Sequence, residues 1–152
     1  MKRELFAVGP YRLATELHYD EATHLWVGLE AAGAARCGFD PLGSETVGDN
    51  VAISFEPVGT TLTRGQAFGS LEAAKFVGPL IAPLSGRITA HNPVVLDRPG
   101  LLNQDPLENW MIRLELADAE REFPLLRHGQ ERVSAWFAAE MDRFKRRGMI
   151  AE

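Results

Sequence analysis

Apolar and polar positions divide the chain into two parts with different periods. Between residues 10 and 116, glycine and proline recur every few positions and separate short apolar runs rich in Val, Ile, Leu and Phe. Short runs bounded by turn residues are typical of β-strands. The predicted strands are 25–29, 50–55, 67–72, 80–83, 86–90 and 110–116. This series predicts a mainly β protein that closes as an antiparallel sandwich or barrel.

The last predicted strand shows the clearest alternation. Met111 and Arg113 alternate with four apolar residues, which are Trp110, Ile112, Leu114 and Leu116. Because successive side chains of a strand point to opposite faces, the four should share one face and place it in the core.

Near the C-terminus the period becomes helical. Apolar residues fall at i, i+3, i+4, i+8 and i+11, which are Val133, Trp136, Phe137, Met141 and Phe144. This spacing gathers them on one side of a helix over 130–147, with the aromatic stripe in the core. Basic residues at 145–147 favour a helix C-terminus, and Gly148 can cap it. A shorter helix is predicted around residues 101–103.

Composition limits the classes of protein that fit. At 152 residues, 45% apolar and 24% charged, the chain matches one domain over 1–152, with a core at about 10–118 and a helical extension at about 120–148. A net charge of −5 without a long basic block argues against nucleic acid and anionic lipid as partners. Proteins or small molecules are the expected partners.

The chain shows no signal for export or membrane insertion. The N-terminal apolar stretch is interrupted by Glu4 and stopped by Pro10, and no run of about 18 apolar residues occurs. Cys37 is the only cysteine, which agrees with a cytoplasmic location and favours an inert small thiol.

No motif for independent catalysis is present. The four histidines are scattered without metal-ligand spacing, and neither a phosphate-binding glycine loop nor a Gly-x-Ser-x-Gly elbow occurs. We therefore expect no catalytic residue, no metal and no enzymatic activity of the chain alone.

Lys75 is the most informative residue. The chain has three lysines, the others being Lys2 and Lys145, against thirteen arginines. Lys75 lies between two turn-rich segments, so the pattern predicts a hairpin that holds an amine away from the protein body. An amine kept at such a tip is a modification site or a solvated surface lysine, and spacing alone leaves both open.

Several segments in order resemble the glycine cleavage H-protein family of lipoyl carriers. The resemblance covers about 24–116 and rests on His24-Leu25-Trp26-Val27, Val47-Gly48-Asp49, Glu56-Pro57-Val58-Gly59, Gly65-Gln66-Ala67-Phe68-Gly69, Leu71-Glu72-Ala73-Ala74-Lys75, Pro83-Leu84-Ser85-Gly86, Asn92, Pro99-Gly100-Leu101-Leu102-Asn103, Asp105-Pro106 and Trp110-Met111-Ile112. It implies a lipoyl/biotinyl-type antiparallel β-sandwich, or hammerhead barrel, with flanking helices and a C-terminal helix. It also implies lipoate in amide linkage to Lys75.

The resemblance suggests roles for five further residues. Glu72 presents the hairpin to the attaching enzyme or only keeps the tip soluble, and Phe76 with Val77 offers an apolar contact for the dithiolane. His24 and Trp26 either line the rest position of the arm or form a half-buried pair on a strand.

Departures from the family pattern point to a different cargo. The family usually has acids where this chain has Leu25 and Pro79, and its Thr-Asp-x-Ala-Gln stretch reads Asp40-Pro41-Leu42-Gly43-Ser44. Loss of acids favours a less cationic cargo than aminomethyl. The sequence therefore resembles most the H-protein-like lipoate-binding proteins of the heterodisulfide-reductase-like sulfur-oxidising system. The implied partners are that complex, a lipoate-attaching enzyme and dihydrolipoamide dehydrogenase.

Three alternatives stay open from the sequence. One is a glycine cleavage H protein that carries the aminomethyl group among the glycine cleavage enzymes. Another is an unmodified binding module that keeps the fold. Biotin attachment is a third, weakened because Lys75 lacks flanking methionines.

Overall fold

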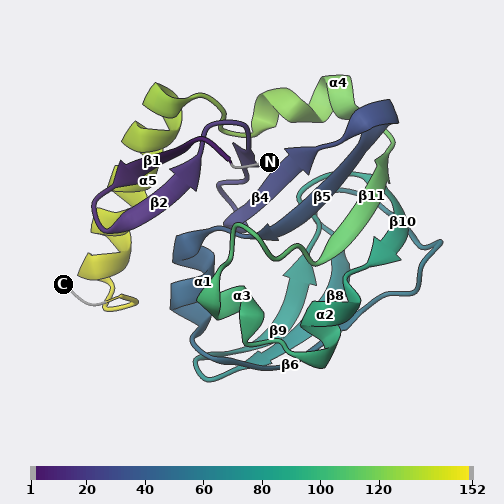
Figure 1. The fold of residues 1–152 in the computed structure, drawn as a ribbon, viewed down its shortest axis with the longest axis horizontal. Helices are drawn as coiled ribbons and strands as arrows, with labels where there is room; N and C mark the ends of the chain where they lie inside the picture. Colours follow the sequence, from purple (N-terminus) through teal and green to yellow (C-terminus); the bar gives the residue numbers. More distant parts are fainter. Residues whose placement is uncertain (1–2, 151–152) are drawn as a thin grey trace.

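The computed structural model of the chain describes residues 3–150, which form three antiparallel sheets and flanking helices (Figure 1). The strands are β1 Leu5–Val8, β2 Tyr11–Ala14, β3 His18–Tyr19, β4 Leu25–Leu29, β5 Ala34–Phe39, β6 Asn50–Phe55, β7 Thr61–Leu62, β8 Ala67–Ala73, β9 Phe76–Ile81, β10 Gly86–His91 and β11 Ile112–Leu116. The helices are α1 Pro41–Val47, α2 Pro93–Asp97, α3 Leu101–Gln104, α4 Ala119–Glu122 and α5 Gln130–Arg146, with short 3₁₀ turns at Ala31–Gly33 and Phe123–Leu125. The predicted class, mainly antiparallel β with a C-terminal helix, is confirmed.

A six-stranded sheet with the order β3-β4-β5-β11-β10-β7 forms the centre of the molecule. Its strand β4 is buried on both faces. Leu25 and Val27 belong to one hydrophobic cluster, together with residues of the β6-β8-β9 sheet, whereas Trp26 between them belongs to a second cluster. Alternation along a strand sends neighbouring side chains to opposite faces, so one short strand joins the two cores.

The second cluster lies beneath the C-terminal helix. Helix α5 packs beside the β1–β2 hairpin (Figure 1). All five predicted apolar residues of α5 are buried, which confirms the stripe as core. The helix ends as predicted near Gly148, whose φ is +69°: its N–H donates to the carbonyl of Lys145, and the N–H of Met149 donates to that of Phe144. This pair of bonds is a Schellman cap.

The third sheet, with the order β6-β8-β9, carries the hairpin of interest. The prediction of a strand only at 80–83 was wrong, because β9 begins at Phe76 and ends at Ile81. Pro79 pairs with Ser70 inside β9. Proline is tolerated there because β9 is an edge strand, on which a missing N–H breaks no ladder.

Sequence patterns missed several other elements. Helix α1 starts after Asp40, whose side chain accepts a bond from the N–H of Gly43, and α2 starts after Asn92, which caps the N–H of Val94. Strand β1 starts at Leu5, before the predicted core of about 10–118.

The predicted strand at 110–116 was too long, because β11 begins at Ile112. Met111 is fully buried rather than on the outer face. Its N–H donates to the carbonyl of Cys37 just before the regular strand, where strict alternation does not apply. No helix among residues 3–150 is long and apolar enough to cross a membrane.

Candidate functional site at the Lys75 hairpin

Lys75 lies at the tip of the β8–β9 hairpin. Ala73 and Phe76 are the last paired residues, so the connection consists of Ala74 and Lys75 alone. Both residues are exposed, yet the tip is held: the N–H of Ala74 donates to the carbonyl of Asp49, and that of Lys75 to the carbonyl of Val47, each at 2.9 Å. The lysine therefore projects from a fixed backbone rather than from a loose loop.

Gly48 makes room for the lysine stem. Its φ of +77° and ψ of −163° lie in a region that only glycine occupies readily. A Cβ at this position would lie 3.2 Å from Cγ and 3.3 Å from Cε of Lys75. The aliphatic stem thus runs directly over the Gly48 backbone, which orients it along the surface of the α1–β6 segment.

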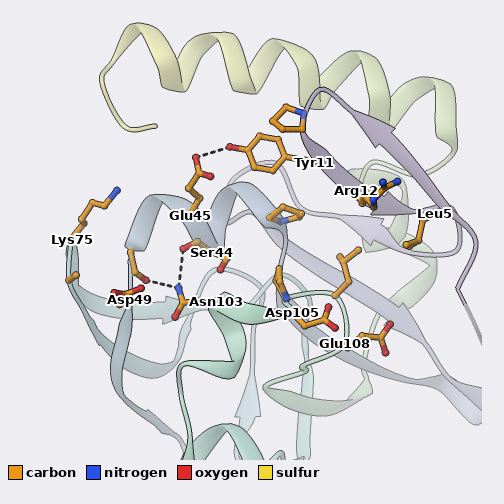
Figure 2. A pocket seen from close by; sticks show the side chains of 16 residues that line it. Leu5, Tyr11, Arg12, Ser44, Glu45, Asp49, Lys75, Asn103, Asp105 and Glu108 are labelled. Carbon is orange, nitrogen blue, oxygen red and sulfur yellow. Dashed lines mark hydrogen bonds between the residues drawn. The ribbon is translucent and has the colours of Figure 1, made fainter. Parts of the chain in front are cut away.

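That segment is fixed by an asparagine at the end of α3. The Asn103 side chain donates to the carbonyl of Gly48 at 2.7 Å (Figure 2) and accepts from the backbone N–H of Asn50 at 2.9 Å. The motif that contains Asn103 was visible in the sequence, but its role as a brace for the lysine hairpin was not. The Lys75 residue is exposed, and no ion pair within residues 3–150 engages it.

Two cavities adjoin the hairpin. The first, called here the acidic cavity, has a volume of about 750 Å³ and includes Lys75 in its wall. Its lining combines the β1–β2 hairpin, α1 and the segment after α3, and its charged residues are Arg12, Glu45, Asp49, Lys75, Asp105 and Glu108. Figure 2 shows Lys75 at one end of the site, with Glu45 between it and Tyr11.

The second cavity, called here the apolar cavity, has a volume of about 310 Å³. It lies on the side of the hairpin that Phe76 and Pro79 face, and among residues 3–150 no carboxylate lines it. Its lining consists of Ala22, Thr23, His24, Leu25, Phe39, Gly43, Thr46, Val47, Phe76, Pro79, Leu80, Ile81 and Met149. Leu25 and Pro79, the two apolar replacements noted in the sequence, therefore share one cavity.

His24 touches the apolar cavity but is held in a buried ionic network. Its Nδ1 lies 2.7 Å from Oδ2 of Asp40 and its Nε2 lies 2.8 Å from Oε1 of Glu140, which also accepts from Arg143. Burial by itself would lower the pKa of His24, but the two carboxylates outweigh it and raise the pKa to about 9. The imidazolium therefore joins β4 to α5 across 116 residues of sequence.

The structure does not bring the other predicted site residues together at one place. Phe76 lines the apolar cavity, whereas Val77 pairs with Glu72 and both line a shallow depression on the outer face of the small sheet. Trp26 is not brought to either cavity beside Lys75: it is fully buried in the second cluster, and its indole N–H donates to the carbonyl of Pro106.

Sequence reasoning missed the contact between Tyr11 and Glu45. The Tyr11 hydroxyl donates to Oε2 of Glu45 at 2.7 Å and closes one side of the acidic cavity (Figure 2). Burial and the neighbouring carboxylate raise the pKa of this phenol, so it stays a donor. Within residues 3–150, no group of three or more His, Cys, Asp or Glu side chains is arranged so that it could hold a metal ion.

Comparison with known proteins assigns the chain and its fold to one family. The family model described as "Glycine cleavage H-protein" matches residues 17–135. The chain is 31% identical over 119 residues to glycine cleavage system H protein 2 of Aquifex aeolicus, covering 78% of this chain and 74% of the relative. It is 36% identical over 115 residues to the H protein of Bacillus mycoides KBAB4, covering 75% and 89%.

A solved structure agrees with these matches. The crystal structure of a glycine cleavage system H protein from Mycobacterium marinum superposes with a TM-score of 0.63 at 29% identity, covering 69% of this chain and 87% of that one. H proteins carry lipoate and are not catalysts themselves. On the combined evidence of sequence and fold, this chain belongs to the glycine cleavage H-protein family.

Proposed function

We propose that this chain is a lipoyl carrier with lipoate in amide linkage to Lys75. The observation that carries the proposal is the position of this amine: it is exposed on a two-residue hairpin tip whose backbone is bonded to Val47 and Asp49. A ligase needs a lysine that it can reach in a fixed geometry, and both conditions hold here.

The residues around Lys75 fit the group. The amine is free of ion pairs within residues 3–150, and the neighbouring cavities offer one acidic and one apolar surface to a tethered arm. Bound lipoate would supply a reversible disulfide and dithiol that can carry a group between enzymes. The chain would contribute anchoring, orientation and shielding.

The relatives favour an aminomethyl cargo and the glycine cleavage enzymes as partners. The named relatives are glycine cleavage H proteins, and none of them points to sulfur oxidation. This role therefore takes precedence over the sulfur-carrying role favoured by the sequence pattern. Dihydrolipoamide dehydrogenase and a lipoate-attaching enzyme complete the proposed set of partners, and the cytoplasm is the proposed location.

One observation favours a second candidate, a carrier for the heterodisulfide-reductase-like sulfur-oxidising complex. Leu25 and Pro79, which stand where the family usually has acids, both line the apolar cavity, and no carboxylate of the described residues 3–150 lines it. A cationic aminomethyl group gains nothing from such walls, because burying a charge without a partner is costly. A sulfur-containing cargo without positive charge would suit them.

Attachment is tested by intact-mass measurement after coexpression with a lipoate-attaching enzyme. We expect Lys75→Arg to lose the lipoyl mass increment completely, because a guanidinium is not a substrate for amide formation. Lys145→Arg is the matched control, since Lys145 lies on α5 and not on the hairpin, and it should keep the increment. An unmodified wild-type chain would favour the binding-module alternative.

The pathway is tested by transfer. Purified lipoylated protein is offered to the aminomethyl-forming and aminomethyl-consuming enzymes of glycine cleavage, and cargo is followed by mass. Loading and release support the glycine cleavage role. Failure to load, together with loading of sulfur from a sulfur-oxidising complex, would support the second candidate instead.

A further inference from the structure

We propose that Asn103 is a positioning residue for the attachment of lipoate to Lys75. Its side chain lies at the end of α3, and its hydrogen bonds go to the turn between α1 and β6 rather than to the hairpin itself. The proposal rests on the proposed attachment at Lys75. It adds that the reaction depends on a side chain from a separate helix, which acts through this turn.

Three consecutive backbone carbonyls of the turn, those of residues 47–49, are divided between the hairpin and Asn103. The first accepts from the N–H of Lys75 and the third from the N–H of Ala74, each at 2.9 Å. The middle one, the carbonyl of Gly48, accepts from the Asn103 side chain at 2.7 Å (Figure 2). The hairpin tip and Asn103 therefore bind alternate carbonyls of the same short segment.

One peptide group of the turn is bonded at both of its ends. The C=O between Asp49 and Asn50 accepts from the N–H of Ala74, and the N–H of the same peptide group donates to Oδ1 of Asn103 at 2.9 Å. Because a peptide group is planar, its C=O cannot turn without its N–H. The bond to Asn103 thus sets the direction in which this carbonyl holds the tip.

The Asn103 side chain is fully used by these contacts. Its amide group donates to the carbonyl of Gly48 and, at 3.5 Å, to that of Ser44, while its oxygen accepts from both the backbone N–H and the side-chain amide of Asn50. A side-chain amide offers two donor hydrogens and two acceptor lone pairs, so every position is taken. The helix behind it is fixed as well, because Leu102 is fully buried and its carbonyl accepts from the Ser44 hydroxyl.

The turn needs such an external partner to keep its shape. Gly48 has a φ of +77° and a ψ of −163°, a conformation that persists only when surrounding contacts enforce it. Ala74 and Lys75 are exposed, so backbone bonds to the turn, rather than core packing, hold the tip. Without Asn103 the turn would sample other conformations, and the tip would less often have the orientation shown here.

The chemistry of attachment shows which kinetic constant should respond. The neutral Nζ of Lys75 attacks the carbonyl carbon of an activated lipoyl group, an acyl adenylate. The amide bond forms, the carbon–oxygen bond to the phosphate breaks, AMP leaves with the electron pair, and the nitrogen gives one proton to solvent. Nζ is the atom of this chain that forms the new bond, so Asn103 acts before this step, on the fraction of chains that the enzyme can bind. A smaller competent fraction raises KM and leaves kcat unchanged.

The test measures lipoylation by a purified lipoate-attaching enzyme with saturating lipoate and ATP and with the chain as the varied substrate. We expect Asn103→Ala to raise KM about tenfold and to leave kcat within about twofold, because the lost hydrogen bonds favour the competent tip. The amides of Ala74 and Lys75 should also exchange with solvent about tenfold faster, since their partners in the turn are no longer fixed. A role in folding alone would lower the midpoint of urea unfolding without either change.

Asn109→Ala is the matched control. Asn109 also donates to two backbone carbonyls at α3, those of Leu101 and Asp105, but these bonds do not reach the turn. This variant should keep the wild-type KM and the wild-type exchange at the tip. Should Asn103→Ala fail to fold, Asn103→Asp provides the same test: the new side chain has nearly the same shape and can still accept from Asn50, but a carboxylate cannot donate to Gly48. It too should raise KM.

The outcomes separate the inference from its premise. Equal KM values for the variants at 103 and for Asn109→Ala would overturn the inference, and so would a fall in kcat at unchanged KM. Faster exchange at the tip with an unchanged KM would overturn it as well, because the tip would then move without effect on attachment. A wild-type chain that gains no lipoyl mass would overturn the proposed function itself, and the mass spectrum shows this before any variant is compared.

Discussion

Lys75 and His24 both carry the family resemblance, yet the fold treats them in opposite ways. Lys75 is exposed at a hairpin tip, and only its backbone is bonded to the rest of the protein. His24 is only 6% exposed, and both of its ring nitrogens contact carboxylates. The Lys75 side chain is therefore left exposed, whereas both ring nitrogens of His24 are already bonded to other side chains.

This difference separates a residue that is available for chemistry from one that holds the structure. His24 also has a φ of +56°, a conformation that is unfavourable for residues other than glycine. Its ring stacks on Trp136, with centroids 5.2 Å apart. Backbone strain of this kind persists only when surrounding contacts enforce it, so His24 is a latch between the sheet and α5 rather than a free ligand for the arm.

The largest expected effect comes from removing the His24 side chain, and it tests whether His24 holds the structure while Lys75 does not. We expect His24→Ala to lower the free energy of unfolding by about 4 kcal/mol, because Asp40 and Glu140 would stay buried without their shared partner. Urea denaturation measures the loss, and hydrogen exchange should show weakened protection of α5. His91→Ala is the control: His91 makes an exposed hydrogen bond to the carbonyl of Glu56 and lies beside the Phe55 ring, and its loss should cost less than about 1 kcal/mol. A similar cost for both variants would contradict the latch.

A somewhat smaller effect is expected from pH. The pKa of His24 is raised to about 9 in the folded state, against 6.5 for a free imidazole. The contribution is complete below pH 6.5, where both states bind the proton, and it is lost as pH rises through about 9. We expect stability to fall by roughly 3 kcal/mol across this interval. Urea titrations at about pH 6.5 and about pH 9.5 measure it, and His24→Ala should abolish the difference.

Acid should also reduce stability, through a different histidine. His18 stacks on His128 with centroids 3.9 Å apart, and its pKa is lowered to about 4, chiefly by burial and also by the neighbouring ring. Its folded state therefore resists protonation below pH 6.5, whereas the unfolded chain takes up the proton. Urea titrations extended down to about pH 4 measure the decline. Together the two histidines place the maximum of stability near pH 6.5.

The two residues also differ in how far the sequence could predict their roles. Lys75 was recognised because its signal is local, with turn residues and the family motif close to it along the chain. The latch was not, because Glu140 lies 116 positions from His24, and no periodicity connects the residue before a strand with a residue inside a distant helix. The same limit hid the Tyr11–Glu45 contact, which spans 34 positions.

Other elements were missed although a local signal was present. Asp40-Pro41 and Asn92-Pro93 each combine an N-cap residue with proline at the first helical position, which is a sequence signal for a helix start. In the sequence pattern, the first pair stands in a segment that departs from the family motif, and the second is typical of a turn. By contrast, Gly78-Pro79 looked like a turn and lies inside β9. Only the sheet order, which makes β9 an edge strand, explains why a strand continues there.

The smallest of the effects concerns the path of the lysine stem over Gly48. We expect Gly48→Ala to lower stability by about 2 kcal/mol, because alanine is strained at its φ and ψ values and its Cβ would press on Lys75. The same contact should slow lipoate attachment, measured as the rate of the mass increase with purified ligase. Gly33→Ala is the matched control, since Gly33 also has a positive φ of +74° but no atom lies within 4 Å of the added Cβ. Gly33→Ala should be destabilised by backbone strain alone and should be modified at the wild-type rate. If Gly48→Ala were lipoylated as fast as Gly33→Ala, Gly48 would matter only for the backbone conformation. The contact between Gly48 and the lysine stem would then have no effect on attachment, and the Lys75 amine would react independently of its neighbours, in still sharper contrast to His24.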